Sequence, residues 1–288
     1  MAGSFRACNC GAVKGRLRMK RLIVLGTGQA VCIHHHNTCF ALDNGEQYFL
    51  IDGGGGSDIL GSFYETGIEW NKLHYAFLSH QHTDHLLGMV WVVRYIAELI
   101  NWNKYEGEFT LYTHDVAAQK LLAVCEMLLK PAQYVLIGPR IHIELVEDGQ
   151  TLSILGSSFT FFDIHSTKAK QFGFRMETPE GLKLVFLGDE PFSEECARYM
   201  EPCDWLLSEA YCLYSEREYY NPYELHHSTV RETCLCAERF HAKKLVIWHT
   251  EDETTYGHRS EAYTAEGRQF YSGEIYVPED YDVIQLDR

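Results

Sequence analysis

The sequence predicts an α/β fold built as a four-layer αββα sandwich, in which two β-sheets pack face to face between outer layers of helices. Three observations favour this fold. The first half alternates short apolar runs with glycine-bearing turns, as hairpins do. Two longer segments carry apolar residues at helical spacing. The second half repeats short apolar runs, each followed at once by a polar residue.

The expected elements follow from these patterns in chain order. Strands are expected at residues 22–25, 39–42, 48–51, 75–78 and 109–112. Residues 86–100 are apolar nearly all round and predict a largely buried helix, and residues 117–129 predict an amphipathic one. Further strands are expected at 141–145, 159–164, 184–187, 205–208 and 245–248. Because rigid strands position exposed loops, functional groups are expected just past the strand ends.

Length and composition indicate how the chain is organised. It has 288 residues, of which 46% are hydrophobic, so it can bury a large core. No linker, charge block or repeat interrupts residues 19–288, which favours one domain there. Residues 1–18 lack an apolar stretch and predict a loosely ordered extension, not a secretory signal. No segment approaches the roughly 20 apolar residues of a membrane span, so we expect no membrane partner.

The ten cysteines indicate a reducing compartment. Their spacing is irregular and no C-x-x-C pair occurs, which predicts ordinary thiols, several of them in the core, in a cytoplasmic protein. A further metal site built from Cys8, Cys10, Cys32 and Cys39 is the alternative.

The formal net charge of -15 disfavours RNA as a partner. Proteins that grip polyanions normally show a basic stripe, because lysine and arginine displace counterions from phosphates. A local basic patch would be needed to overcome the repulsion.

The most informative stretch is His80-Gln81-His82-Thr83-Asp84-His85, which directly follows the expected strand at 75–78. It places four metal-competent side chains within six residues. Imidazole nitrogens and carboxylate oxygens are ligands for Zn²⁺ and similar ions, and a strand that ends in a tight loop can aim them at one point. The stretch therefore predicts part of a two-metal site.

This stretch resembles the H-x-H-x-D-H signature of the metallo-β-lactamase superfamily, and the chain is most similar to its ribonuclease Z branch. Further segments match that branch in order: 22–28 (LIVLGTG), 49–54, 164–165, 172–175, 184–189 (LVFLGD), 208–210, 227–229 (HST) and 245–249. The resemblance implies the αββα sandwich and a hydrolase with two divalent ions.

The resemblance also implies a ligand set in which one carboxylate bridges the two ions. His80, His82 and His165 would hold the first ion, Asp84, His85 and His249 the second, and Asp189 both. Each lies at or just past an expected strand end. Zn²⁺ is the default for such ligands, with Mn²⁺ or Fe²⁺ as alternatives. A water between two such ions loses a proton near neutral pH and becomes the nucleophile.

The candidate catalytic residues are Asp84, His227 and Glu209. In the ribonuclease Z pattern, the histidine of a His-Ser-Thr turn, oriented by a glutamate, protonates the leaving oxygen, and these positions match His227 and Glu209. A carboxylate supports the charged imidazole that a general acid requires. The adjacent His226 is the alternative proton donor.

Three further features bear on the site. His34-His35-His36 lines the active-site mouth or is a solvated run, and we do not count these residues as ligands. Asn37 and Asp52 resemble residues that support the metal-binding ones. Residues 211–223 hold five tyrosines, which favours a homodimer interface over stacking on a substrate.

The leading functional hypothesis is a ribonuclease Z-like phosphodiesterase acting on a small-molecule or nucleotide-derived ester. Only 13 residues separate Arg175 from Asp189, enough for a hairpin but not for the long arm with which many ribonuclease Z enzymes clamp tRNA. The alternatives are hydrolysis of another ester (an aryl sulfate, a lactone or a thioester), tRNA 3′ cleavage, and a non-catalytic metal-binding module.

Overall fold

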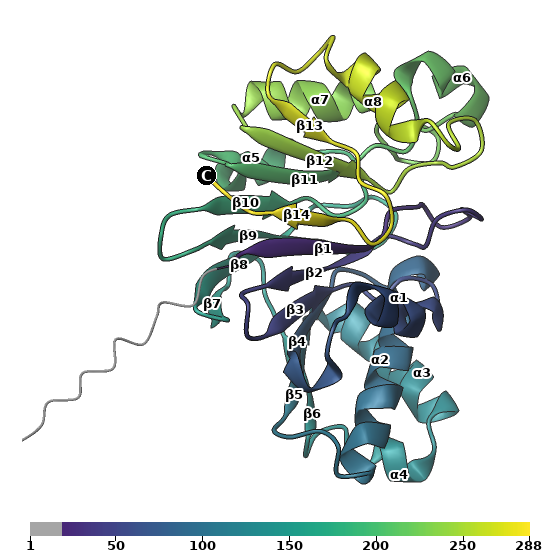
Figure 1. The fold of residues 1–288 in the computed structure, drawn as a ribbon, viewed down its shortest axis with the longest axis vertical. Helices are drawn as coiled ribbons and strands as arrows, with labels where there is room; N and C mark the ends of the chain where they lie inside the picture. The colour runs from purple at the N-terminus through teal and green to yellow at the C-terminus, as the bar shows by residue number, and fades with distance from the viewer. Residues whose placement is uncertain (1–18) are drawn as a thin grey trace, which may run out of the picture.

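The computed structural model describes residues 19–288, which form two seven-stranded sheets packed face to face (Figure 1). The expected extension at 1–18, with Cys8 and Cys10, lies outside the described residues. The first sheet has the strand order β14-β1-β2-β3-β4-β5-β6. Its strands are β1 (Arg21–Gly26), β2 (Cys39–Asp43), β3 (Tyr48–Ile51), β4 (Leu73–Leu78), β5 (Phe109–Thr113), β6 (Ile141–Leu145) and β14 (Val283–Gln285).

The second sheet has the order β13-β12-β11-β10-β9-β8-β7. Its strands are β7 (Thr151–Ile154), β8 (Ser157–Asp163), β9 (Phe172–Glu177), β10 (Lys183–Phe186), β11 (Trp205–Glu209), β12 (Lys244–Trp248) and β13 (Glu274–Tyr276). β3 to β6 pair in parallel in the first sheet, and β10 to β13 do so in the second. Parallel neighbours end at one edge of a sheet, so the residues that follow them gather there.

The core between the sheets explains why the strands are continuous apolar runs. In β1, Leu22 and Val24 pack into the inter-sheet core, whereas Ile23 and Leu25 pack under the helices of the outer layer. A strand that is buried on both faces has no polar alternation. The inter-sheet core is rich in phenylalanine, and the rings of Phe77 and Phe161 lie 5.0 Å apart across it.

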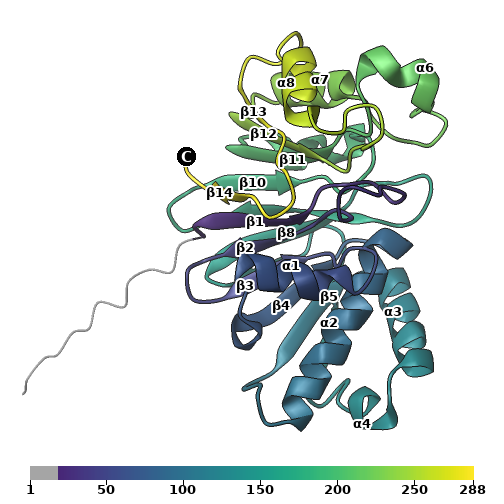
Figure 2. The same cartoon turned by 45° about the vertical axis from the view of Figure 1, so that its right-hand side comes forward.

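Helices cover both outer faces of the sandwich (Figures 1 and 2). Over the first sheet lie α1 (Asp58–Thr66), α2 (Thr83–Asn101), α3 (Asp115–Leu128) and α4 (Pro131–Tyr134). Over the second lie α5 (Ala197–Met200), α7 (Val230–Arg239) and α8 (Arg259–Gly267), with α6 (Arg217–Tyr220) beyond them. The predicted αββα sandwich is therefore confirmed.

Most of the predicted elements are present, and several elements were not predicted. Each predicted strand overlaps an observed one, and the predicted helices fall on α2 and α3. The elements that were not predicted are α1, α4, α5, α6, α7, α8, β7, β13 and β14. β9 and β10 form an antiparallel hairpin closed by a short turn at 178–182, as expected between Arg175 and Asp189.

Two smaller expectations concern cysteines and membrane spans. The eight cysteines of the described region are free thiols, and six of them are buried. Among residues 19–288, no helix has the length and apolar character needed to cross a bilayer.

Candidate metal centre

The loop between β4 and α2 carries the first candidate ligands. β4 ends at Leu78 and α2 begins at Thr83, so the histidine-rich stretch turns within a few residues. His80 is fully buried, and Asp84 and His85 lie in the first turn of α2. A carboxylate in the first turn is stabilised by the partial positive charge of the helix N-terminus.

Asp52, which directly follows β3, holds this loop in place. Its carboxylate accepts hydrogen bonds from the backbone N–H and the hydroxyl of Ser79, both at 2.7 Å, and lies 2.8 Å from Nδ1 of His85. With Nδ1 bound to Asp52, the Nε2 atom of His85 faces Asp84 and Asp189. The supporting contact that the resemblance implies for Asp52 is present.

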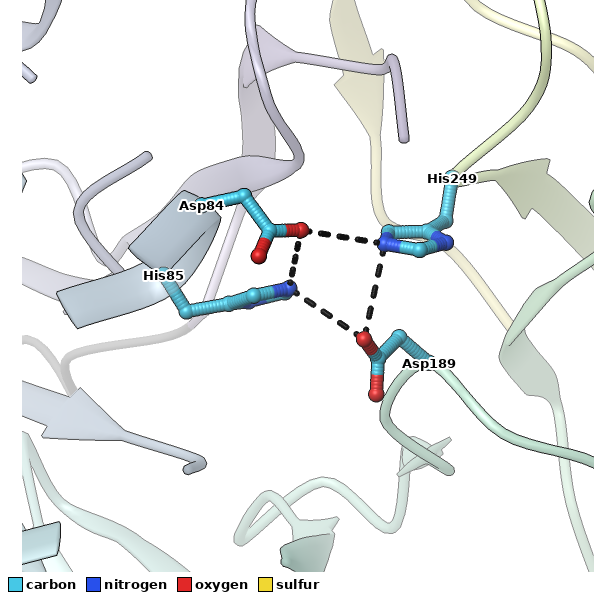
Figure 3. Close-up of side chains that lie close together, drawn as sticks. All are labelled: Asp84, His85, Asp189 and His249. Carbon is cyan, nitrogen blue, oxygen red and sulfur yellow. Dashed lines mark hydrogen bonds and ion pairs between the residues drawn. The ribbon is translucent and has the colours of Figure 1, made fainter. Parts of the chain in front are cut away.

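Two further side chains come from the second sheet. Asp189 follows β10 after Gly188, whose φ of +78° is a left-handed conformation suited to glycine. His249 directly follows β12. Asp189 contacts His85 and His249 contacts Asp84, so that segments from opposite halves of the sandwich meet at one point (Figure 3).

The spacing of these four side chains fits a divalent ion. Nε2 of His85 lies 3.2 Å from Oδ2 of Asp84 and 3.4 Å from Oδ2 of Asp189. Nε2 of His249 lies 3.4 Å from each of the same two oxygens. Ligand atoms about 2.0–2.1 Å from one tetrahedral ion lie roughly 3.3–3.4 Å apart. Nε2 of His85 is also buried without a hydrogen-bond partner. We call these residues the four-ligand group.

A second group shares one residue with the first. The ligand atoms of His80, His82 and Asp189 lie within 4.8 Å of one another. Nε2 of His80 lies 2.8 Å from Nδ1 of His82 and 3.5 Å from Oδ2 of Asp189. We call these residues the three-ligand group. Asp189 belongs to both groups, the position required of a bridging carboxylate.

His165 differs from the expected arrangement and belongs to neither group. It lies just past β8, as expected, but its φ is +59° and its backbone N–H donates to the carboxylate of Asp163. The exposed imidazole pairs with Glu195, at 3.2 Å. The amide nitrogen of Gln171 instead contacts Asp189 and lies 3.1 Å from Nδ1 of His80. The direction of the backbone at residue 165 therefore separates its side chain from the other six candidate ligands.

The charges of the site are balanced between carboxylates and imidazoles. Burial raises the pKa of Asp189, but the imidazoles of His80, His85 and His249 lower it by more, so the net pKa lies well below its usual range. Burial holds the pKa of His80 well below its ordinary value, which leaves the neutral form that binds metals. Burial also lowers the pKa of His85, but the charges of Asp84 and Asp52 raise it well above the ordinary value. A metal ion here would replace the proton on His85.

The second candidate feature is a buried carboxylate–imidazole pair. Glu209 ends β11; one of its oxygens accepts the N–H of Ser228 at 2.5 Å, and the other lies 3.6 Å from Nδ1 of His227. Burial lowers the pKa of His227, but the contact with Glu209 raises it by more, so the net shift is upward. The imidazole lies near the four-ligand group, its centroid 5.3 Å from that of His249. His226, in contrast, is exposed and contacts Thr167.

Comparison with known proteins identifies the family. A family model described as a beta-lactamase superfamily domain matches residues 49–250, well over half of the chain. The chain belongs to this superfamily.

Its relatives and structural neighbours agree with this assignment. Ribonuclease Z of Thermococcus sibiricus is 23% identical over 324 residues, covering 93% of this chain and 97% of that protein. The metallo-beta-lactamase fold protein YhfI from Bacillus subtilis has a TM-score of 0.76 at 18% identity, over 92% of this chain and 99% of that one. The short form of human tRNase Z has a TM-score of 0.70 at 17% identity, over 93% and 100%. The chain is therefore a ribonuclease Z-like, metal-dependent hydrolase of the superfamily.

In this superfamily member, the ligand groups open into a pocket of about 580 Å³. Asp84, Asp189, His227 and His249 form part of its wall, and residues of α2 and α3 form another part. The pocket is within the size range of small-molecule sites, which is about 300–1,000 Å³. Candidate metal ligands and the candidate proton donor therefore line the same cavity.

The histidine run at 34–36 is held by acidic residues and does not join either ligand group. The backbone N–H groups of residues 33–35 donate to Asp252, and that of His36 donates to Asp280. The ring of His34 stacks on Tyr256. Asn37 donates to the carbonyl of Gln29, a residue of the pocket wall.

Two residues lie beside the site that were not assigned to it from the sequence: Tyr211 belongs to the segment expected at a homodimer interface, and Gln171 was not singled out. Tyr211 stacks on His227 with ring centroids 5.1 Å apart, and Gln171 contacts the three-ligand group. Tyr211 follows directly on the Ser208-Glu209-Ala210 motif, so its position along the chain could have indicated it. No pattern in the sequence distinguishes Gln171.

Proposed function

We propose that the chain is a binuclear phosphodiesterase similar to ribonuclease Z, with Zn²⁺ as its ion. The observation that carries the proposal is the carboxylate of Asp189, which belongs to both ligand groups and opens on the same pocket as His227. The four-ligand group would hold one ion with protein ligands alone. The three-ligand group would hold the other and leave a coordination position open, as catalytic sites do.

The ions would supply an activated water and neutralise charge on the attacked phosphate. The residues of the chain would position the ions and supply the proton. Asp189 sets the spacing of the two ligand groups, and Asp52 keeps His85 oriented toward its ion. Glu209 stabilises the protonated form of His227, which donates that proton to the leaving oxygen. An alkoxide leaves poorly without a proton, so this pair favours diesters over activated esters.

Two features support a small substrate over tRNA. The turn at 178–182 is too short to form a tRNA-clamping arm, and the net charge of -15 repels long polyanions. A pocket of about 580 Å³ suits a ligand of nucleotide size. We therefore propose a nucleotide-derived or other small phosphodiester.

The proposal is tested with the purified full chain. Bound metals are counted, and cleavage of bis-p-nitrophenyl phosphate is measured before and after chelation and again after Zn²⁺ is restored. An aryl sulfate, a lactone and a thioester are assayed in parallel. We expect two ions per chain and chelator-sensitive cleavage of the diester. Cleavage of one of the other esters without cleavage of the diester would refute phosphodiesterase activity and favour that ester class. Two bound ions without any turnover would support a non-catalytic module.

A further inference from the structure

The charged wall of the pocket suggests which diesters it accepts. The residues that line it include two carboxylates, Asp84 and Asp189, and both belong to the ligand groups. The remaining full charges in the lining are the two lysines Lys120 and Lys168. In a chain with a net charge of -15, the charges of the pocket lining that do not belong to the ligand groups are thus both positive.

The two lysines occupy different places. Nζ of Lys168 lies 3.2 Å from Nε2 of His227 and 3.7 Å from a carboxylate oxygen of Glu190, so it is held at the reacting end of the pocket. Lys120 lies on α3, one helical turn before Val124, and both residues line the pocket. Within the described part of the chain, Lys120 has no carboxylate partner. Its ammonium group is therefore available to an anionic ligand.

An apolar surface lies on the same side of the pocket as Lys120. Leu86 and Leu87 come from α2, which contacts α3 alongside it (Figure 2). A ligand that extends from the ligand groups toward Lys120 would pack its uncharged part against these side chains. A sugar or base fits such a surface, because both present apolar faces.

We propose that Lys120 binds a second phosphate of the substrate, so that the enzyme prefers small nucleotide diesters that also carry a terminal phosphate. This inference rests on the proposed function. Lys168 faces the diester that is cleaved, and Lys120 selects the substrate by its distal charge.

The test compares two dinucleotides that differ only in a 5′-phosphate, pTpT and TpT, on the Zn²⁺-loaded full chain. One charge-assisted contact at a partly exposed site is worth about five- to tenfold in affinity. We expect pTpT to have the lower KM, and Lys120→Ala to raise that KM about five- to tenfold without changing kcat or the KM for TpT. Lys120→Arg should restore most of the preference. Lys104→Ala removes an exposed lysine outside the pocket lining and should change neither substrate.

A binding measurement separates this inference from the proposed function. Calorimetry with thymidine 3′,5′-bisphosphate and thymidine 5′-monophosphate needs no turnover. Tighter binding of the bisphosphate that is lost in Lys120→Ala supports the second phosphate site even if neither dinucleotide is cleaved. Equal binding of both compounds, or an equal effect of Lys120→Ala on both, would overturn it even if cleavage is observed. Much tighter binding of a decathymidylate would overturn the nucleotide-sized substrate class.

Discussion

Replacing His227 by alanine separates a proton-donor role from a structural one. The imidazole is mostly buried, with 11% of its side chain exposed, and it contacts Glu209, Tyr211 and Lys168 without belonging to either ligand group that shares Asp189. We therefore expect His227→Ala to keep both ions. A general acid contributes about 10²- to 10⁴-fold to a rate. This corresponds to about 3–5 kcal/mol of activation free energy.

The assay compares two thymidine 5′-phosphate esters that differ in the leaving group. Methoxide is a poor leaving group and needs a proton to depart, whereas p-nitrophenolate leaves readily without one. We expect His227→Ala to lose about 10²-fold or more in kcat on the methyl ester and to lose little on the p-nitrophenyl ester. His226→Ala is the matched control, because this adjacent histidine is exposed, and it should retain activity on both esters. Full activity of His227→Ala on the methyl ester, or an equal loss on both, would refute the proton-donor role.

Four further predictions concern metal content and stability. Asp189→Ala should abolish two-metal occupancy, because its carboxylate serves both ligand groups; metal analysis after dialysis measures this. Asp52→Asn should weaken metal binding about 10- to 100-fold in a chelator competition, because the hydrogen bond that orients His85 is weakened. His165→Ala should leave the metal content unchanged, since His165 pairs with Glu195 outside both groups. Phe161→Ala should lower the free energy of unfolding by about 3–5 kcal/mol in a denaturant titration, because it opens a cavity between the sheets.

Controls and contrary outcomes differ among these variants. Asp58→Ala removes an exposed carboxylate and should keep both ions, whereas two ions in Asp189→Ala would exclude a bridging role. An unchanged affinity in Asp52→Asn would show that other contacts orient His85. Loss of one ion in His165→Ala would show that the loop carries this residue into the three-ligand group. If Phe161→Ala lowered the free energy of unfolding by less than about 1 kcal/mol, the neighbouring side chains would have filled the cavity.

The fold follows largely from local patterns in the sequence. Strands such as β1 and β3 are buried on both faces, so each is an uninterrupted apolar run that periodicity detects. The unassigned helices α7 and α8 are shorter and less apolar than α2 and α3. α7 buries Val230, Thr233, Cys234 and Ala237, a stripe of mostly small or polar residues that binary patterning does not mark as a core face.

The chemistry of the site can be read from the sequence, because six adjacent residues hold four candidate ligands and the remaining candidates follow strand ends. Which of these residues meet depends on how the two sheets pack. Asp189 and His249 join Asp84 and His85 because parallel strands of two packed sheets end at one edge. His165 also follows a strand, yet it points to another partner, because the direction of a side chain depends on the local φ and on contacts with distant segments. Neither of these can be read from spacing along the chain.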